Sequence, residues 1–173
     1  MRLTPELLEF IHQDVIDPGP IPDVEHFSDE EYAHVVDELE KQLPSSEPVR
    51  VFAYGSLIWN PEYEVKRSRE GKVFGWHRAF CMHIERFRGS RDVPGLMMGL
   101  ERGGSCRGVI HEISMSKRRQ SLDSIVRREM ITQPCTYEPR WLPVHSGDQV
   151  IMALAMIFDR KGVFYRGGLD LDV

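Results

Sequence analysis

The strongest structural signal in this chain is an alternating apolar run that stops at a glycine-serine pair. The run from Val49 to Tyr54 predicts a β-strand, and Gly55-Ser56 directly after it predicts a sharp turn. Glycine at such a turn lets consecutive backbone N–H groups face one concave nest, which binds an anion without a charged side chain. We therefore expect the N–H groups of Gly55, Ser56 and Leu57 to hold the acid group of a ligand. An ordinary turn between a strand and a loop is the alternative that spacing alone leaves open.

Length and composition predict one main globular domain. The chain has 173 residues, of which 41% are hydrophobic, and this is enough to bury one sizeable core. No run of about 18 uninterrupted apolar residues is present, so the sequence predicts no membrane-spanning helix. The segment from Met1 to Glu6 lacks the charged and then apolar layout of a signal peptide. We therefore predict a cytoplasmic protein.

The residue types that commonly bind metals and cofactors show no suitable spacing. The cysteines Cys81, Cys106 and Cys135 are far apart and form no Cys-x-x-Cys pair, which argues against a disulfide framework and a zinc site. We expect each to be a buried or half-buried small hydrophobe. The histidines show no His-x-x-x-His spacing, the glycines form no dinucleotide or P-loop fingerprint, and Ser56 lacks the second glycine of a nucleophile elbow. We therefore expect no metal and no cofactor.

Charge is distributed unevenly along the chain. Residues 1–48 contain 13 Asp or Glu and 2 Lys or Arg, although the whole chain carries a net charge of only -5. The later residues are therefore positive, and much of that excess lies between Lys66 and Arg91. Such a stretch favours an anionic partner, although a solvated surface is the simpler alternative for most of its side chains. A sequence pI of 5.8 and the lack of an aromatic-interleaved basic motif favour a small anionic peptide over nucleic acid.

Residues 1–48 are expected to form an N-terminal arm of two helices. Thr4-Pro5 begins the first helix, whose apolar residues recur from Leu7 to Val15. The capping box Ser28 to Glu31 begins the second, and Pro44 follows its last apolar residue. Both helices are too short to be stable alone, so we expect their apolar faces to pack on the following domain. Their acidic faces would then complement the basic stretch.

Beyond residue 48 the pattern is rich in strands and contains one helix, from about Ser116 to Met130. Gly103-Gly104-Ser105 is expected to be the turn of an antiparallel pair. This order lacks the regular alternation of a doubly wound sheet and predicts an α+β fold. The expected strands are Arg50–Tyr54, Lys72–Trp76, Ala79–Ile84, Leu96–Glu101, Arg107–Ile113, Arg140–Val144 and Val150–Phe158.

Four segments of this part of the chain follow one another in an informative order. The first is Tyr54–Trp59, which contains Tyr-Gly-Ser-Leu, and the second is Gly75–Phe80. The third is the loop Arg88–Leu96. The fourth is the helix end Arg127-Arg128-Glu129-Met130, with Tyr137–Trp141 following it. Together these segments resemble the γ-glutamylcyclotransferase superfamily, and specifically its ChaC branch of glutathione-specific enzymes.

The resemblance covers about residues 49–168. It implies a compact mixed β-sheet or partly closed barrel flanked by helices, so that residues 49–173 would form the γ-glutamylcyclotransferase-like domain. It also implies cleavage of a γ-glutamyl peptide, such as glutathione, into 5-oxoproline and a free amine. The α-amino group of the substrate attacks its own γ-carbonyl, so the enzyme needs a proton-transfer group and no serine or cysteine nucleophile.

The resemblance assigns that proton transfer to Glu129. Without it, a glutamate at a helix end would usually be a solvated ion-pairing residue. A low-dielectric site walled by Tyr137 and Trp141 would raise the pKa of Glu129, whereas Arg128 nearby would lower it. Successive helical side chains are about 100° apart, so we expect Arg128 to point away from Glu129.

The same resemblance implies which residues bind the substrate. The nest would hold the glutamyl α-carboxylate, and Tyr137 would orient the glutamyl group. Charge and loop placement, and not the resemblance, favour Arg88 or Arg91 as the contact of the glycyl carboxylate of glutathione. Tyr54 would either contact the ligand or lie in the core with its hydroxyl satisfied. The full set of expected substrate-binding residues is Tyr54, Gly55, Ser56, Leu57, Ile58, Arg88 and Tyr137.

Two features depart from the family pattern. The link from Met130 to Thr136 is longer than in similar proteins and lacks their glycine, which would displace Tyr137. The chain stops shortly after Gly167-Gly168-Leu169, where bacterial members continue into a helical tail, so we expect that tail to be absent.

Two other functions stay open: a cyclotransferase for other γ-glutamyl amines or amino acids, and a non-catalytic γ-glutamyl- or anion-binding module. The oligomeric state is not predicted.

Overall fold

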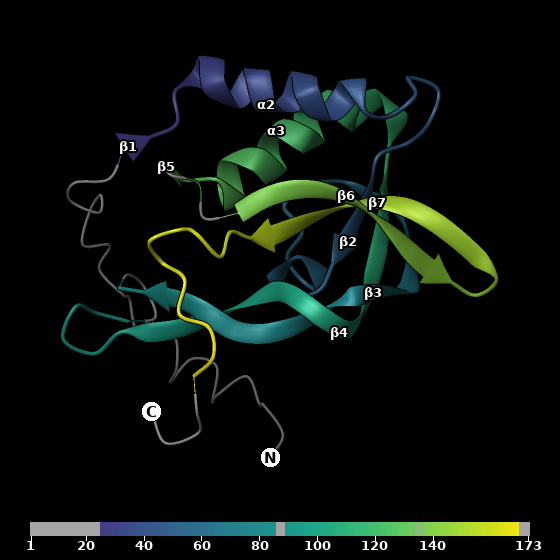
Figure 1. Cartoon of the computed structure of the whole chain (residues 1–173). Coiled ribbons are helices and arrows are strands. Elements are labelled where there is room, and N and C mark those ends of the chain that lie inside the picture. The colour runs from purple at the N-terminus through teal and green to yellow at the C-terminus, as the bar shows by residue number, and fades with distance from the viewer. Residues whose placement is uncertain (1–24, 86–88, 134, 136, 170–173) are drawn as a thin grey trace, which may run out of the picture.

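The protein is built around a closed β-barrel with two helices stacked on one side of it (Figure 1). The computed structural model describes residues 25–85, 89–133, 135 and 137–169. The barrel strands follow the order β2-β4-β3-β6-β7. They are β2 (Arg50–Ala53), β3 (Val65–Ile84), β4 (Gly95–Ile113), β6 (Tyr137–Ser146) and β7 (Gln149–Phe158). Because β2 and β7 pair in parallel and the other neighbours are antiparallel, the predicted mixed sheet of an α+β fold is confirmed, and the sheet is fully closed.

Alternating residues of the strands divide the core into two parts. Phe52 of β2 belongs to a cluster made only of barrel residues, whereas its neighbours Val51 and Ala53 belong to a second cluster shared with the helices. The side-chain period of two in a strand explains this division, because successive side chains face opposite sides of the sheet. Cys81 and Cys106 are buried and Cys135 is half-buried, all as free thiols, which confirms their expected packing role.

The expected turn at Gly103-Gly104-Ser105 is wrong. These residues lie inside β4, which pairs with β3 along nearly its whole length. Gly103 and Gly104 have φ values of +109° and +62°, and Gly75 on the facing strand has +79°. A register shift between Phe74 and Trp76 lies at the same point. The glycines therefore bend two long strands together instead of reversing the chain, and each long strand was predicted as two short ones.

Two helices cover the barrel, with α3 (Arg118–Glu129) between the barrel and α2 (Asp29–Lys41) (Figure 1). The capping box at Ser28 is confirmed, since its hydroxyl accepts from the Glu31 N–H and the Glu31 carboxylate accepts from the Ser28 N–H. The predicted helix near residues 116–130 is also confirmed, with a 3-10 turn at Met115–Lys117 before it. The first helix of the expected arm lies outside the described residues. In the described part of the chain, no helix is long and apolar enough to cross a membrane.

The acidic face of α2 meets α3 and not the basic stretch between Lys66 and Arg91. Asp37 pairs with Arg119 at 2.7 Å, and Asp29 pairs with Arg127 at 2.7 Å. For α2, the expected pairing of its acidic face with the basic stretch was therefore wrong. Because the apolar faces of α2 and α3 pack together, their polar flanks lie side by side and neutralise each other first.

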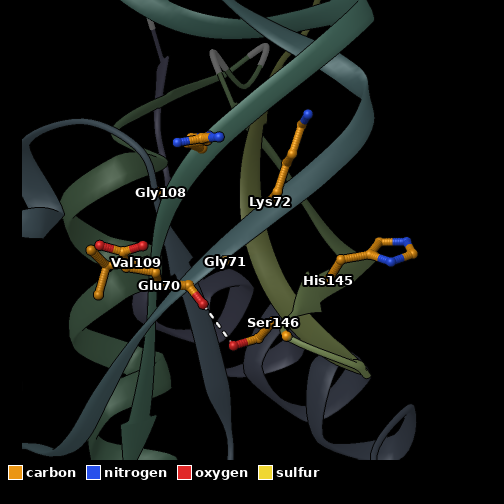
Figure 2. A pocket seen from close by; sticks show the side chains of 9 residues that line it. Glu70, Gly71, Lys72, Gly108, Val109, His145 and Ser146 are labelled. Atoms are coloured by element: carbon orange, nitrogen blue, oxygen red, sulfur yellow. Dashed lines mark hydrogen bonds between the residues drawn. The ribbon is translucent and has the colours of Figure 1, made fainter.

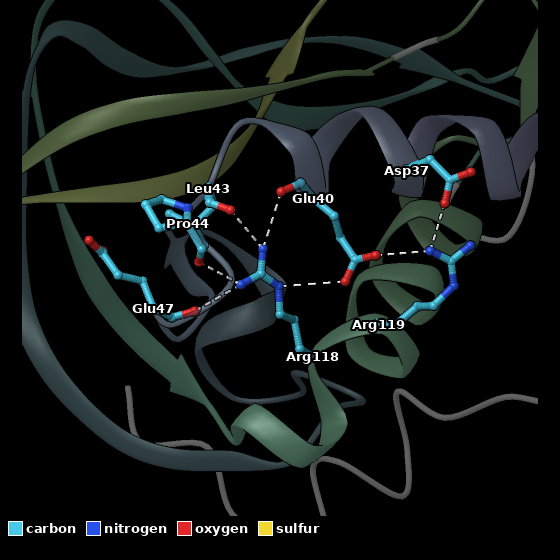
Figure 3. A network of polar contacts seen from close by, with 7 residues as sticks. All are labelled: Asp37, Glu40, Leu43, Pro44, Glu47, Arg118 and Arg119. Carbon is cyan, nitrogen blue, oxygen red and sulfur yellow. Dashed lines mark hydrogen bonds and ion pairs between the residues drawn. The ribbon is translucent and has the colours of Figure 1, made fainter.

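Arg118, at the start of α3, binds the end of α2 (Figure 3). Its side chain is only 11% exposed, and it also lies 3.5 Å from the Glu40 carboxylate. The guanidinium donates to four backbone carbonyls, those of Glu40 (3.3 Å), Leu43 (3.1 Å), Pro44 (2.9 Å) and Glu47 (3.0 Å). The Glu40 and Pro44 carbonyls also accept from the N–H groups of Leu43 and Glu47. Arg118 is the donor for the Leu43 and Glu47 carbonyls, which would otherwise need water.

We expect Arg118→Met to lower the free energy of unfolding by roughly 2–4 kcal/mol, because the Leu43 and Glu47 carbonyls lose their donor and Glu40 loses an ion-pair partner. The matched control is Arg119→Met, since Arg119 makes only ion pairs at a half-exposed position. Urea denaturation of both variants measures the difference. Equal losses in the two variants would contradict a special role for Arg118.

Candidate active site

Glu129 is the last residue of α3, and its side chain is only 15% exposed. Burial raises the pKa of this carboxyl above its ordinary value, and the nearby Glu62 carboxylate adds to the increase. Arg128 acts in the opposite direction but does not cancel the effect of burial. A raised pKa makes this carboxylate a stronger base than an ordinary glutamate, which suits general acid–base chemistry.

Arg128 does not point away from Glu129, contrary to expectation. Its Nε lies 3.3 Å from Glu129 Oε1. The other guanidinium nitrogens reach the chain after β2: Nη1 donates to the Asn60 carbonyl at 2.8 Å and pairs with Glu62 Oε1 at 2.9 Å, and Nη2 donates to Ser56 Oγ at 3.1 Å. A long side chain with a planar fork can curl past the 100° offset of adjacent helical residues. Arg128 therefore ties the turn after β2 to the end of α3.

The predicted turn after β2 is a short 3-10 helix, η1 (Ser56–Ile58). The N–H groups of Ile58 and Trp59 close it by donating to the carbonyls of Gly55 and Ser56. The first N–H groups of any such turn have no partner inside it, so those of Ser56 and Leu57 are available. The space beside the Gly55 α-carbon is open, because a β-carbon built there would meet no described atom within 4 Å. This geometry suits the expected binding of an anion.

The other residues of this turn differ in how accessible they are. Leu57 is buried and Ile58 is half-buried against the core beneath the helices. Tyr54 is only 8% exposed, and its hydroxyl donates to the Met156 carbonyl at 2.7 Å. This is the arrangement of a core tyrosine with its hydroxyl satisfied, the alternative that the sequence left open.

Tyr137, at the start of β6, is buried and lies within electrostatic reach of Glu129. The negative charge of Glu129 contributes to raising the pKa of the Tyr137 phenol, although burial is the larger cause. The Tyr137 hydroxyl donates to the Met82 sulfur at 3.6 Å, and a thioether is a weak acceptor. This hydroxyl is therefore free to exchange its partner for a stronger acceptor on a ligand.

The remaining predicted site residues are less informative. Arg88 lies outside the described residues. Arg91 is exposed, and its Nε lies 3.5 Å from Glu85. The Trp141 indole N–H is buried and has no hydrogen-bond partner among the described residues.

Three residues that the sequence did not single out lie around Arg128 and Glu129. Glu62 and Asn60 contact Arg128, and the Asn60 side-chain amide also donates to Glu62 at 3.3 Å. Tyr63 is half-buried, and the negative charge of Glu129 is one cause that raises its pKa, after burial. Glu62 has φ of +55°, an uncommon backbone state for a residue with a side chain. About 67 residues separate Glu62 from Glu129 in the chain, and no motif links them.

Two of the cavities among the described residues have volumes of about 420 and 150 Å³, and Glu129 lines neither of these two. The site is recognised instead by its chemistry: a buried carboxyl, a guanidinium that bridges it to a turn with available N–H groups, and buried tyrosines around it.

Comparisons with known proteins show the family to which this chain belongs. Residues 49–173 match the family model described as ChaC-like protein. Glutathione-specific gamma-glutamylcyclotransferase of Escherichia coli is 38% identical over 119 residues, which are 68% of this chain and 51% of that protein. Glutathione-specific gamma-glutamylcyclotransferase 1 of Mus musculus is 31% identical over 120 residues, 68% of this chain and 54% of that protein. The chain thus spans about half the length of these curated relatives.

The fold is also similar to that of a solved structure. A gamma-glutamyl cyclotransferase specific to glutathione from yeast aligns with a TM-score of 0.65 at 15% sequence identity. The alignment covers 73% of this chain and 76% of the yeast chain. At this level of identity the likeness establishes the shared fold.

The raised pKa of Glu129 predicts a pH-dependent stability. Below the ordinary pKa of 4.5, the Glu129 carboxyl carries its proton in both the folded and the unfolded chain. As the pH rises, the carboxyl of the unfolded chain ionises first. The wild type therefore loses stability until the pH passes the raised pKa of Glu129 in the folded chain. We expect Glu129→Gln to be more stable than the wild type near pH 7, with a difference that shrinks toward about pH 4. Arg128 keeps Glu62 as its ion-pair partner in this variant.

Urea denaturation at both pH values measures this difference. The control is Glu64→Gln, at an exposed carboxyl that forms no ion pair within the described part of the chain. A Glu129→Gln variant that is less stable than the wild type near pH 7 would show that the carboxylate is stabilising, contrary to the prediction.

Proposed function

This chain belongs to the ChaC-like family, and from that premise we propose that it is a γ-glutamylcyclotransferase that cleaves glutathione into 5-oxoproline and cysteinylglycine. The observation that carries the proposal is the buried, pKa-raised carboxyl of Glu129 beside a turn with available N–H groups. The names of the Escherichia coli and mouse relatives support glutathione as the substrate.

The reaction needs one group that moves a proton between two nitrogens of the substrate. The α-amine of the glutamyl group attacks its γ-carbonyl carbon, a new C–N bond closes the five-membered ring, and the bond to the cysteine nitrogen breaks. The amine gives up one proton and the departing nitrogen takes one, so the balance is zero. In this proposal Glu129 takes the first proton and returns it to the departing nitrogen.

Substrate binding supplies the second requirement, which is folding of the glutamyl chain. The N–H groups of Gly55, Ser56 and Leu57 would hold the α-carboxylate, and Tyr137 would orient the glutamyl group. Fixing the α-carboxylate places the α-amine over the γ-carbonyl, and well-oriented intramolecular reactions of this kind gain about 7 kcal/mol or more. Arg88 or Arg91 remains our proposal for the glycyl carboxylate. The free thiols of Cys81, Cys106 and Cys135 fit the reducing cytoplasm, where we place the protein.

The first test is incubation of the purified protein with glutathione and detection of 5-oxoproline and cysteinylglycine by mass spectrometry. We expect the wild type to form both products and Glu129→Gln to form neither, while Glu129→Gln still binds glutathione in calorimetry. Product from Glu129→Gln at the wild-type rate would refute the role of Glu129. Binding without product from the wild type would favour the non-catalytic binding module.

A second γ-glutamyl substrate is the alternative within the same chemistry. Gamma-glutamylcyclotransferase 2-3 of Arabidopsis thaliana, whose name does not specify glutathione, is 33% identical to this chain over 82 residues. Release of 5-oxoproline from other γ-glutamyl amines or amino acids, and not from glutathione, would favour this alternative.

Arg128 should affect activity in two separable ways. Its positive charge lowers the pKa of Glu129, and its guanidinium N–H groups hold the turn after β2. Arg128→Lys keeps the charge beside Glu129 but loses contacts to the turn, so we expect kcat/KM to fall by about 10²-fold with an unchanged acidic limb of the pH profile. Arg128→Gln removes the cation that lowers the pKa of Glu129, so the acidic limb should also move to higher pH.

The other groups around Glu129 do not produce this shift. Glu62 keeps its opposing effect in both variants, and the phenols of Tyr54, Tyr63 and Tyr137 stay neutral because their pKa values are raised. Full activity of Arg128→Lys, or an acidic limb that does not move in Arg128→Gln, would contradict the prediction.

A further inference from the structure

Two cationic side chains and one imidazole form a row across three neighbouring strands, away from the residues around Glu129. Lys72 on β3 is the register partner of Arg107 on β4 and also of His145 on β6. Register partners in an antiparallel pair project from the same face of the sheet, about 5 Å apart. The row Arg107, Lys72, His145 therefore spans roughly 10 Å on one face of the barrel.

This row borders a surface groove of about 420 Å³ (Figure 2). Gly71 and Gly108 line the groove and face each other as register partners. A β-carbon on Gly71 would come within 2.7 Å of Val144, and one on Gly108 within 2.4 Å of the Ala53 carbonyl. Both side-chain positions therefore point into the barrel, where packing requires glycine, and the groove side of these two residues presents backbone alone.

The side chains of this row lack acidic partners among the described residues. Among the described residues, Lys72, Arg107 and His145 form no ion pair. Glu70 is the acidic residue of the groove lining, and it makes no ion pair with them. Like charges at directly opposed positions in a sheet are unfavourable, so this row would gain from a shared anion.

Phe74, two residues after Lys72 on the same strand face, contacts the side chains of Lys72 and His145. The Lys72 ammonium lies 4.7 Å from the centre of its ring, and the His145 ring packs edge to face against it at 5.0 Å. Phe74 itself is 55% exposed. The row is therefore partly held in place before any ligand binds, which lowers the entropic cost of binding.

We propose that this groove binds a small molecule that carries several linked phosphate groups. One carboxylate or one phosphate could meet only part of a row about 10 Å long, whereas a chain of phosphates can reach both cations and the ring N–H of His145. The groove volume lies within the range of small-ligand sites. Inorganic polyphosphate and a nucleotide share this chemistry.

The experiment is a titration of the full chain with inorganic triphosphate, followed by amide NMR shifts and calorimetry at constant ionic strength. We expect shifts at residues 71–74, 105–109 and 144–147, and affinity about tenfold or more weaker in the double variant Lys72→Gln/Arg107→Gln. The matched control is Lys66→Gln/Arg67→Gln on the same strand, which removes the same charges outside the groove lining. Lys72→Arg/Arg107→Lys keeps the charges and should keep binding.

The outcomes distinguish a specific binding site from nonspecific electrostatic attraction. Equal weakening in the groove and control variants, or no saturable binding by the wild type, would overturn the proposal. ADP that binds more tightly than inorganic pyrophosphate, with added shifts at Phe74, identifies the nucleotide as the source; equal affinity identifies the phosphate chain alone. Excess glutathione should leave the titration unchanged, and displacement by glutathione would overturn a separate site. None of these readouts depends on cyclotransferase activity.

Discussion

The packing of α3 between α2 and the barrel decides where the Glu129 carboxyl lies. Leu122, Ile125 and Val126 are buried at helical spacing and fix the rotation of the helix on the core. Arg118 at its beginning and Arg128 at its end fix its ends by binding backbone carbonyls of other segments. Since Glu129 is the last helical residue, any change in this seating would move the carboxyl relative to the turn after β2.

The electrostatics of Glu129 depend on two opposing effects of the same seating. Burial at the helix end disfavours the carboxylate, whereas the neighbouring Arg128 favours it, and burial is the stronger of the two. A fully exposed Glu129 would be a weak base, and a closer Arg128 would make it weaker. Because Arg128 also shares its fork with Glu62, Ser56 and the Asn60 carbonyl, its charge is divided among several acceptors. Sharing the charge of Arg128 among these acceptors weakens its lowering effect on the pKa of Glu129.

The sequence predicted local features well and distant contacts poorly. The capping box at Ser28, the strand before Gly55 and the helix before Glu129 depend on neighbours in the chain, and the structure contains all three. The strand bend at Gly103 was mistaken for a turn, because a positive φ serves both and only pairing with β3 distinguishes them. Glu62 was missed because its contact with Arg128 arises only when the turn and helix meet.

The charge asymmetry of the chain acquires a different meaning in the folded protein. The acidic residues of α2 are engaged by Arg118, Arg119 and Arg127, which come from the same packed pair of helices. Their negative charge is therefore not available to the cations of β3 and β4. Pairing of the consecutive strands β3 and β4 makes Lys72 and Arg107 register partners, and an anion from outside would relieve their repulsion. The uneven sequence charge thus separates into ion pairs between α2 and α3 and a pair of cations on the barrel with no acidic partner among the described residues.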